Sequence, residues 1–226
     1  MTFAEKTWGD CKNAVAYQLN FIQLCYGYDS DCYNDYFNIC PHCGHAVSQK
    51  KDYEYPKSGF SKKDYYLLDT YDCGVSCELM EYMLSFGIIR GNFRPVFTRN
   101  HNILLGYQIT PIHTLSSYVA NTYFAKKKLI CDFCSKIEYE YPDDSFSVYN
   151  GVGYPVYITK NILDEINEYH IIKTSEHKED IIISLELYSY LINKYPRIEC
   201  RPVFLGELKD DPEYIRLHKN KTGITR

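Results

Sequence analysis

The sequence predicts an α+β fold built from two related halves. Two distant segments resemble each other: SCELMEYMLSFGIIRGNFRPVF at Ser76–Phe97 and SLELYSYLINKYPRIECRPVF at Ser184–Phe204. Each begins Ser-x-Glu-Leu, continues with apolar residues at helical spacing and ends in Arg-Pro-Val-Phe. A Cys-x-x-Cys pair precedes each unit. This shared order predicts a single domain over residues 1–226, made of two pseudo-repeats at about 37–110 and 128–206.

The repeated units predict a helix followed by a short strand. Ser76 and Ser184 are suited to cap the helices, because a serine hydroxyl accepts a hydrogen bond from a free N–H of the first turn. Gly87 and Pro196 are expected to end the helices. The Arg-Pro-Val-Phe segments predict strands, and proline places them at a sheet edge or a strand start because it lacks an N–H donor.

Other segments complete the outline. The tetrapeptide Tyr-Glu-Tyr-Pro occurs at 53–56 and 139–142, which we interpret as a second echo between the halves. A further helix is predicted from Thr159, and the segment 151–160 predicts a turn that enters a strand. The segment Val15–Cys25 is apolar without clear periodicity, so both helix and strand stay open.

Composition and charge narrow the function classes. The 226 residues include 25 basic and 29 acidic ones, which gives a net charge of −4. Nucleic-acid binders need a clustered cationic surplus, so this balance argues against one. No apolar stretch approaches the roughly 20 residues that cross a bilayer, so no membrane association is expected. No secretory leader is visible, and ten cysteines without one predict a reducing compartment, by default the cytoplasm.

The motif that carries chemistry is a duplicated Cys-x-x-Cys pair, formed by Cys40 with Cys43 and by Cys131 with Cys134. Two intervening residues let the chain form a tight knuckle in which both thiolates reach one ion. Pro41 fixes one turn angle, and Gly44 supplies a position that tolerates positive φ. A site with four protein ligands has no open coordination position for substrate, so the prediction is one structural zinc ion (Zn²⁺) per chain.

Three alternatives stay open for these cysteines. A redox-active pair is one, although Gly44 opposes the helix that should follow such a motif. Metal-free buried thiols are the second, because far more residues separate the pairs than in a compact zinc ribbon. The third is a different ligand set, whose substitutes would be Cys32, His42 and His45. Cys73 and Cys77 have three intervening residues and begin a predicted helix, so we interpret them as packing.

The sequence shows no arrangement typical of an active site. The seven histidines are scattered, none lies in an H-E-x-x-H pattern, and no Ser/His/Asp or Cys/His constellation has supporting context. The prediction is therefore a non-enzyme.

The order of these motifs resembles the double-CXXCG motif proteins, a bacterial family of this length. Members carry one CxxCG motif in the first quarter and another past the middle. A helix–strand unit lies between the pairs and a similar one closes the chain, like ELMEYMLSFGIIRGNFRPV and ELYSYLINKYPRIECRPV here. The resemblance covers most of residues 37–206. One departure is Ser135, which stands where the family has glycine and removes no ligand.

Proteins of this family are associated with polymorphic toxin systems as immunity proteins. The resemblance implies that the chain binds and neutralises a cognate toxin domain in the cytoplasm of the producing cell. Aromatic residues anchor interfaces and acidic ones attract a basic partner. The first expected contact surface is Asp29, Asp31, Tyr33, Asp35 and Tyr36, and the second is the segment 206–214; a solvated acidic loop is the alternative for both. The cysteine pairs alone would instead suit a zinc-ribbon nucleic-acid-binding or regulatory module.

Overall fold

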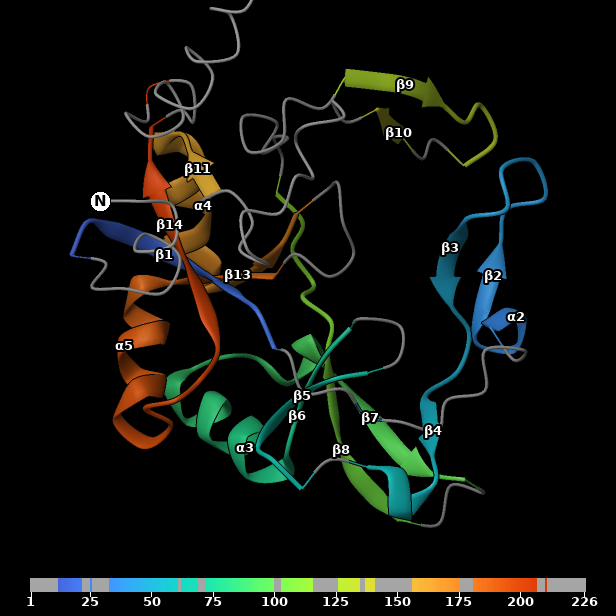
Figure 1. Ribbon diagram of the computed structural model, residues 1–226, viewed down its shortest axis with the longest axis horizontal. Helices are drawn as coiled ribbons and strands as arrows, with labels where there is room; N and C mark the ends of the chain where they lie inside the picture. Colours follow the sequence, from blue (N-terminus) through green and yellow to red (C-terminus); the bar gives the residue numbers. More distant parts are fainter. Residues whose placement is uncertain are drawn as a thin grey trace, which may run out of the picture.

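The computed structural model describes residues 12–21, 25, 33–60, 62–68, 72–99, 103–115, 126–134, 137–140, 156–174, 181–206 and 210. The fold is mixed α+β, as the sequence predicts. Two five-stranded sheets and two two-stranded ribbons are present in this part of the chain, together with the helices that cover them (Figure 1).

The first sheet has the strand order β4-β7-β8-β6-β5. Its strands are β4 (Tyr53–Tyr55), β5 (Tyr65–Leu67), β6 (Cys73–Val75), β7 (Phe93–Thr98) and β8 (Leu104–Ile109). Strand β4 runs parallel to β7, and every other neighbouring pair is antiparallel. Two short 3₁₀ turns accompany this sheet, η2 (Lys57–Gly59) and η3 (Arg90–Asn92).

The second sheet has the order β11-β14-β1-β13-β12. Its strands are β1 (Ala14–Leu19), β11 (Val156–Ile158), β12 (Ile171–Lys173), β13 (Ile181–Ser184) and β14 (Cys200–Leu205). Here β11 runs parallel to β14 and the remaining pairs are antiparallel. The pattern of directions is therefore the same as in the first sheet, with β14 in the place of β7 and β1 in the place of β8.

Strand β1 settles the first part of the segment Val15–Cys25, which the sequence left open between helix and strand, since Ala14–Leu19 is the central strand of the second sheet. Residues 22–24 of that segment lie outside the described residues. It lies outside the range 128–206 predicted for the second pseudo-repeat. In the first sheet the corresponding strand β8 directly follows β7, whereas β1 is supplied from the other end of the chain.

Two details of the strand prediction were wrong. The prolines of the Arg-Pro-Val-Phe segments were expected at a sheet edge or a strand start, but β7 and β14 each have a neighbour on both sides, and Pro95 and Pro202 are the third residue of their strands. Pro95 and Pro202 are tolerated there because the parallel neighbour pairs only from the next residue, Val96 or Val203. The Tyr-Glu-Tyr-Pro echo is not structural either, since Tyr53–Tyr55 lies in the first sheet while Tyr139 lies in a separate ribbon.

The helices begin where the sequence predicts. Helix α3 (Cys77–Phe86) is capped by the Ser76 hydroxyl, which accepts a hydrogen bond from the Leu79 N–H at 3.1 Å. Helix α5 (Leu185–Lys194) is capped by Ser184 in the same way, through the Leu187 N–H at 3.1 Å. Gly87 ends α3 with a left-handed φ of 116°, and α5 ends before Pro196. Helix α4 (Lys160–Tyr169) follows Thr159, also as expected.

One hydrophobic core contains residues from both sheets and from α3 and α5. It includes Val75 and Met83 from the first-sheet side, and Ile183 and Leu187 from the second-sheet side. Helix α4 covers a second core on the other face of the second sheet, where Ile166 packs with strand residues. A third core joins the first sheet to the segment around Tyr36.

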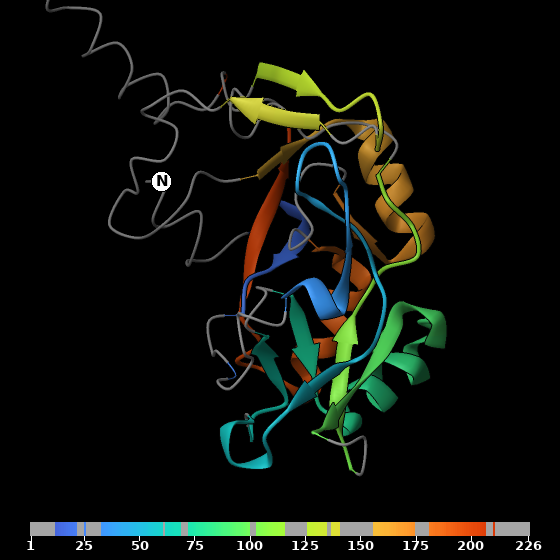
Figure 2. The same ribbon diagram turned by 90° about the vertical axis from the view of Figure 1, so that its right-hand side faces the viewer.

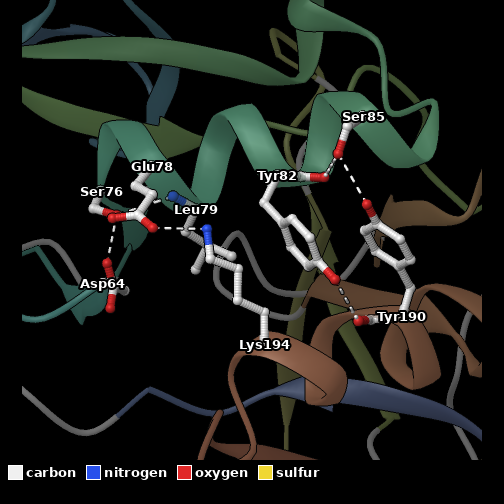
Figure 3. A network of polar contacts seen from close by, with 8 residues as sticks. All are labelled: Asp64, Ser76, Glu78, Leu79, Tyr82, Ser85, Tyr190 and Lys194. Atoms are coloured by element: carbon white, nitrogen blue, oxygen red, sulfur yellow. Dashed lines mark hydrogen bonds and ion pairs between the residues drawn. The ribbon is translucent and has the colours of Figure 1, made fainter.

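Polar and aromatic contacts line the seam between α3 and α5 (Figure 3). The rings of Tyr82 and Tyr190 stack with centroids 4.4 Å apart, and the Tyr82 hydroxyl donates to the Tyr190 carbonyl at 3.3 Å. The Lys194 ammonium lies 2.7 Å from the Glu78 carboxylate. Because both groups of this ion pair are substantially exposed, the stacked rings and the shared core are expected to stabilise the seam more than the pair does.

Replacing Leu187 by Ala should lower the free energy of unfolding by about 2–5 kcal/mol, because Leu187 is fully buried in the shared core. The loss should reach both sheets. Hydrogen exchange of amides in β7 and β8 should accelerate together with exchange in β1 and β13. The control is Ser189→Ala, an exposed position on the same helix, which should leave both unchanged. Faster exchange in the second sheet alone would contradict a shared core.

Candidate metal centre

The two Cys-x-x-Cys pairs lie at the tips of the two ribbons. The first ribbon consists of β2 (Phe37–Ile39) and β3 (Ala46–Gln49), and the second of β9 (Lys126–Ile130) and β10 (Ile137–Glu140). In each ribbon the cysteines occupy the connection between the strands. The tips approach each other although the ribbons are far apart in the sequence, as both views show (Figures 1 and 2).

All four cysteine sulfurs lie within 4.8 Å of one another. The Cys40 and Cys131 sulfurs are 3.8 Å apart, and those of Cys43 and Cys134 are 3.6 Å apart. Sulfurs bound at about 2.3 Å to one ion, at the corners of a tetrahedron, lie about 3.8 Å from each other. A disulfide would instead need about 2.05 Å, so these cysteines are free thiols. The four side chains therefore lie close enough to bind one metal ion.

The backbone of the first tip forms a tight turn over residues 41–43. The Cys40 N–H donates to the His45 carbonyl at 2.8 Å, and the Gly44 N–H donates to the Cys40 carbonyl at 2.9 Å. Gly44 has a φ of 70°, and no described atom lies within 4 Å of the position that a Cβ would take. Glycine is therefore favoured here by backbone conformation and not by crowding.

Backbone N–H groups point at the sulfurs and favour their ionised forms. Burial opposes ionisation of Cys40, but the N–H groups of Cys43 and His42 outweigh it and lower the pKa of the Cys40 thiol to about 6. The N–H groups of Cys134 and Phe133 likewise lower the pKa of Cys131.

Cys43 responds in the opposite direction. The His45 N–H lowers the pKa of the Cys43 thiol. Burial and the neighbouring Cys40 and Cys131 raise it by more, so the net shift of this pKa is upward. The cluster thus stabilises some thiolates at the expense of others. A bound cation would remove this conflict, because its charge stabilises all four thiolates at once.

An aromatic pair lies beside the cysteines. The rings of His42 and Phe133 stack with centroids 4.7 Å apart and planes 12° from parallel. Each ring comes from the third position of its Cys-x-x-Cys motif, and Phe133 is 64% exposed. Sequence reasoning missed this contact, although an aromatic residue at the same position of both motifs was a visible signal.

The structure bears on two of the three alternatives for the cysteines, the redox-active pair and the different ligand set. Strand β3, and no helix, follows the first pair, so the strand–motif–helix order of a thioredoxin-like site is missing. The ring of His42 stacks on Phe133, and Nδ1 of His45 has no hydrogen-bond partner among the described residues; neither joins the four-sulfur group. Cys32 lies outside the described residues. Cys73 packs in the shared core as predicted, whereas Cys77 is exposed at the start of α3.

The predicted contact surface is only partly described. Asp29, Asp31 and the Tyr33 side chain lie outside the described residues, as does nearly all of 206–214. Helix α2 (Tyr33–Tyr36) contains the other two. Asp35 is exposed, but Tyr36 is 6% exposed and packs with Tyr53 at 5.5 Å between centroids. Tyr36 is therefore a core residue and is not available to a partner.

A Ser/His/Glu grouping occurs at the start of α5. The Ser184 hydroxyl lies 2.9 Å from Nδ1 of His170, and a Glu186 carboxylate oxygen lies 4.0 Å from the same nitrogen. Ser184 is fully buried and already accepts the Leu187 N–H, and both partners meet one nitrogen of the imidazole. In a catalytic triad the hydroxyl is accessible, and the serine and the carboxylate meet different nitrogens of the imidazole. Neither condition holds here, so we interpret Ser184 as a helix cap.

Comparison of the chain with protein-family models, curated proteins and solved structures finds no match. None of the helices described by the structure is long and apolar enough to span a bilayer. The arrangement of the four cysteines is thus the strongest structural indication of what the protein binds.

The purified protein should contain about one metal ion per chain by elemental analysis, because its four thiols fit one tetrahedral ion. Replacing Cys40, Cys43, Cys131 or Cys134 by Ser should each abolish stoichiometric metal and lower the unfolding midpoint, since metal binding contributes to folding. Cys77→Ser should retain the metal, because Cys77 is exposed and separate from the cluster. A metal-free wild type, freshly purified under reducing conditions, would refute the site.

Proposed function

We propose that the four cysteines hold one structural zinc ion and that the protein is an immunity protein, which binds and neutralises a cognate bacterial toxin domain. The observation that carries the proposal is the convergence of two ribbon tips into a closed set of four thiols. A site with four protein ligands has no open position for substrate, so its ion would act on structure. The working surface of the protein then lies elsewhere on the scaffold.

A single zinc ion suits the four cysteines better than an iron–sulfur cluster does. Four thiolates in a tetrahedron are typical of zinc or of iron–sulfur sites. In an iron–sulfur cluster, iron and sulfide lie between the cysteines and hold their sulfurs further apart than in a single-ion site. The separations of 3.6 and 3.8 Å favour a single ion.

The ion would join two related halves. Each half has a ribbon with a cysteine pair, a parallel edge strand, a hairpin and a serine-capped helix, and the two sheets repeat the same pattern of strand directions. Zinc would connect the halves at the ribbon tips, while the seam of α3 and α5 connects them through the core. A scaffold held at two places loses little conformational entropy on binding, which favours a tight inhibitor.

The toxin partner follows from the resemblance in motif order to the double-CXXCG immunity proteins. The net charge of −4 suits capture of a basic toxin domain, because opposite charge speeds association. Asp35 is exposed and is therefore still available as part of the expected contact surface.

Cobalt substitution tests the ligand set of the proposed zinc site. Protein refolded with Co²⁺ should show the intense visible absorption of a tetrahedral thiolate complex, and stoichiometric Zn²⁺ should bleach it. Cys131→Ser should weaken and shift this spectrum, while Cys77→Ser should reproduce the wild type. Octahedral cobalt spectra in the wild type would count against the site.

Co-expression tests the immunity function. The proposal predicts that a neighbouring gene encodes a toxin domain, and cells that express this domain should survive when the wild type or Cys77→Ser is present at equal levels. Cys131→Ser should protect less, because loss of metal lowers its folded fraction. Killing that continues despite soluble wild-type protein would refute the immunity role. Salt-dependent binding of DNA or RNA at about 50 mM salt would favour the nucleic-acid module instead.

A further inference from the structure

A cavity of about 230 Å³ lies where the first ribbon meets the two sheets. The ribbon contributes Phe37 and Val47, and the first sheet contributes Arg94 and Gln108. Lys173, from the end of β12, brings in the second sheet. The four metal-binding cysteines do not line it. Ligand pockets usually measure about 300–1,000 Å³, so this one is suited to a small molecule.

Gln108 is an unusual residue for the inside of a sheet. It is 3% exposed, and its side-chain oxygen Oε1 has no hydrogen-bond partner in the described part of the chain. Its strand neighbours are Gly74, which has no side chain, and Arg94. Buried carbonyl oxygens are nearly always paired, so this one indicates a missing N–H or O–H donor.

Two cationic groups line the same cavity. The Arg94 guanidinium is held by Asp52, to which Nε donates at 2.6 Å, and by the Gln49 carbonyl, to which Nη1 donates at 3.3 Å. Its third nitrogen, Nη2, has no partner within the described chain, and neither has the Lys173 ammonium. A carboxylate suits these two groups, because it accepts charge-assisted hydrogen bonds from both.

The lining also has an anionic group. The carboxylate of Asp72 accepts a hydrogen bond from the Tyr53 hydroxyl at 2.6 Å, which fixes its position. An ammonium group in the cavity would find two acceptors in the lining, this carboxylate and Oε1 of Gln108. Phe37, Val47 and Ile109 supply apolar surface.

We propose that this cavity binds a free α-amino acid with an apolar side chain. The carboxylate is recognised by Arg94 and Lys173, and the ammonium by Asp72 and Gln108. The apolar lining receives the side chain. This inference is independent of the proposed immunity function, because it rests on none of the residues assigned to the metal or the toxin.

The test is calorimetric titration of the metal-loaded protein with L-valine, L-leucine, L-methionine and L-phenylalanine. At least one should bind saturably below about 10 mM. For that amino acid, the matching carboxylic acid without the amino group and the matching amine without the carboxylate should each bind at least about tenfold more weakly. Failure of all four amino acids to bind the wild type at about 10 mM would overturn the proposal.

Variants locate the site. Lys173→Gln and Gln108→Leu should each weaken binding about tenfold or more, because each removes one recognition group. Lys57→Gln removes the same charge at an exposed position outside the cavity and should bind like the wild type. Lys173 lies at a partly exposed strand end, so its variant tests the site even when Gln108→Leu folds poorly. Wild-type affinity in Lys173→Gln, or equal affinity for the carboxylic acid alone, would refute the assignment.

Discussion

The four cysteine sulfurs bring up to four negative charges within 4.8 Å of one another, and the ribbon tips depend on how that charge is balanced. Backbone N–H groups of the turns offset part of it at Cys40 and Cys131, but Cys43 is left harder to ionise than an ordinary thiol. A bound cation would stabilise all four thiolates at once. A two-stranded ribbon is marginally stable by itself, so the position of β9 and β10 relative to β2 and β3 depends on this balance.

The core between α3 and α5 provides a different kind of connection. Its residues are apolar and come from both sheets, so its stability comes from burial and does not require a metal. The ribbon tips and the seam of α3 and α5 lie in different parts of the molecule (Figure 1). Two separated connections restrict relative rotation of the sheets far more than either would alone. If the four cysteines bind a metal as proposed, its loss should therefore loosen the ribbons first and leave the shared core in place.

Local signals in the sequence identified the parts that local chemistry determines. Ser76 and Ser184 cap helices because a hydroxyl three residues before a free N–H needs nothing from the rest of the fold. The cysteine pairs were recognisable because a turn of two intervening residues sets their spacing, although their meeting depends on the whole chain. Pro95, β1 and Tyr36 were misjudged or left open for the opposite reason. Whether a strand is interior, where its neighbour comes from and what covers a ring all depend on contacts far along the chain. The cavity could not be predicted from the sequence either, since Gln108 and Lys173 come to line one cavity only in the folded protein.

The cavity and the metal centre share a structural element, which couples them. Phe37 and Val47 line the cavity and belong to the ribbon whose tip contains Cys40 and Cys43. A displacement of the ribbon therefore changes the cavity wall and the sulfur positions together. Any ligand that binds the cavity only when the ribbon is in place must favour the metal-bound form, and the metal must favour ligand binding by the same factor. The metal centre, to which we assign only a structural role, would then affect ligand binding in the cavity through the short ribbon of β2 and β3.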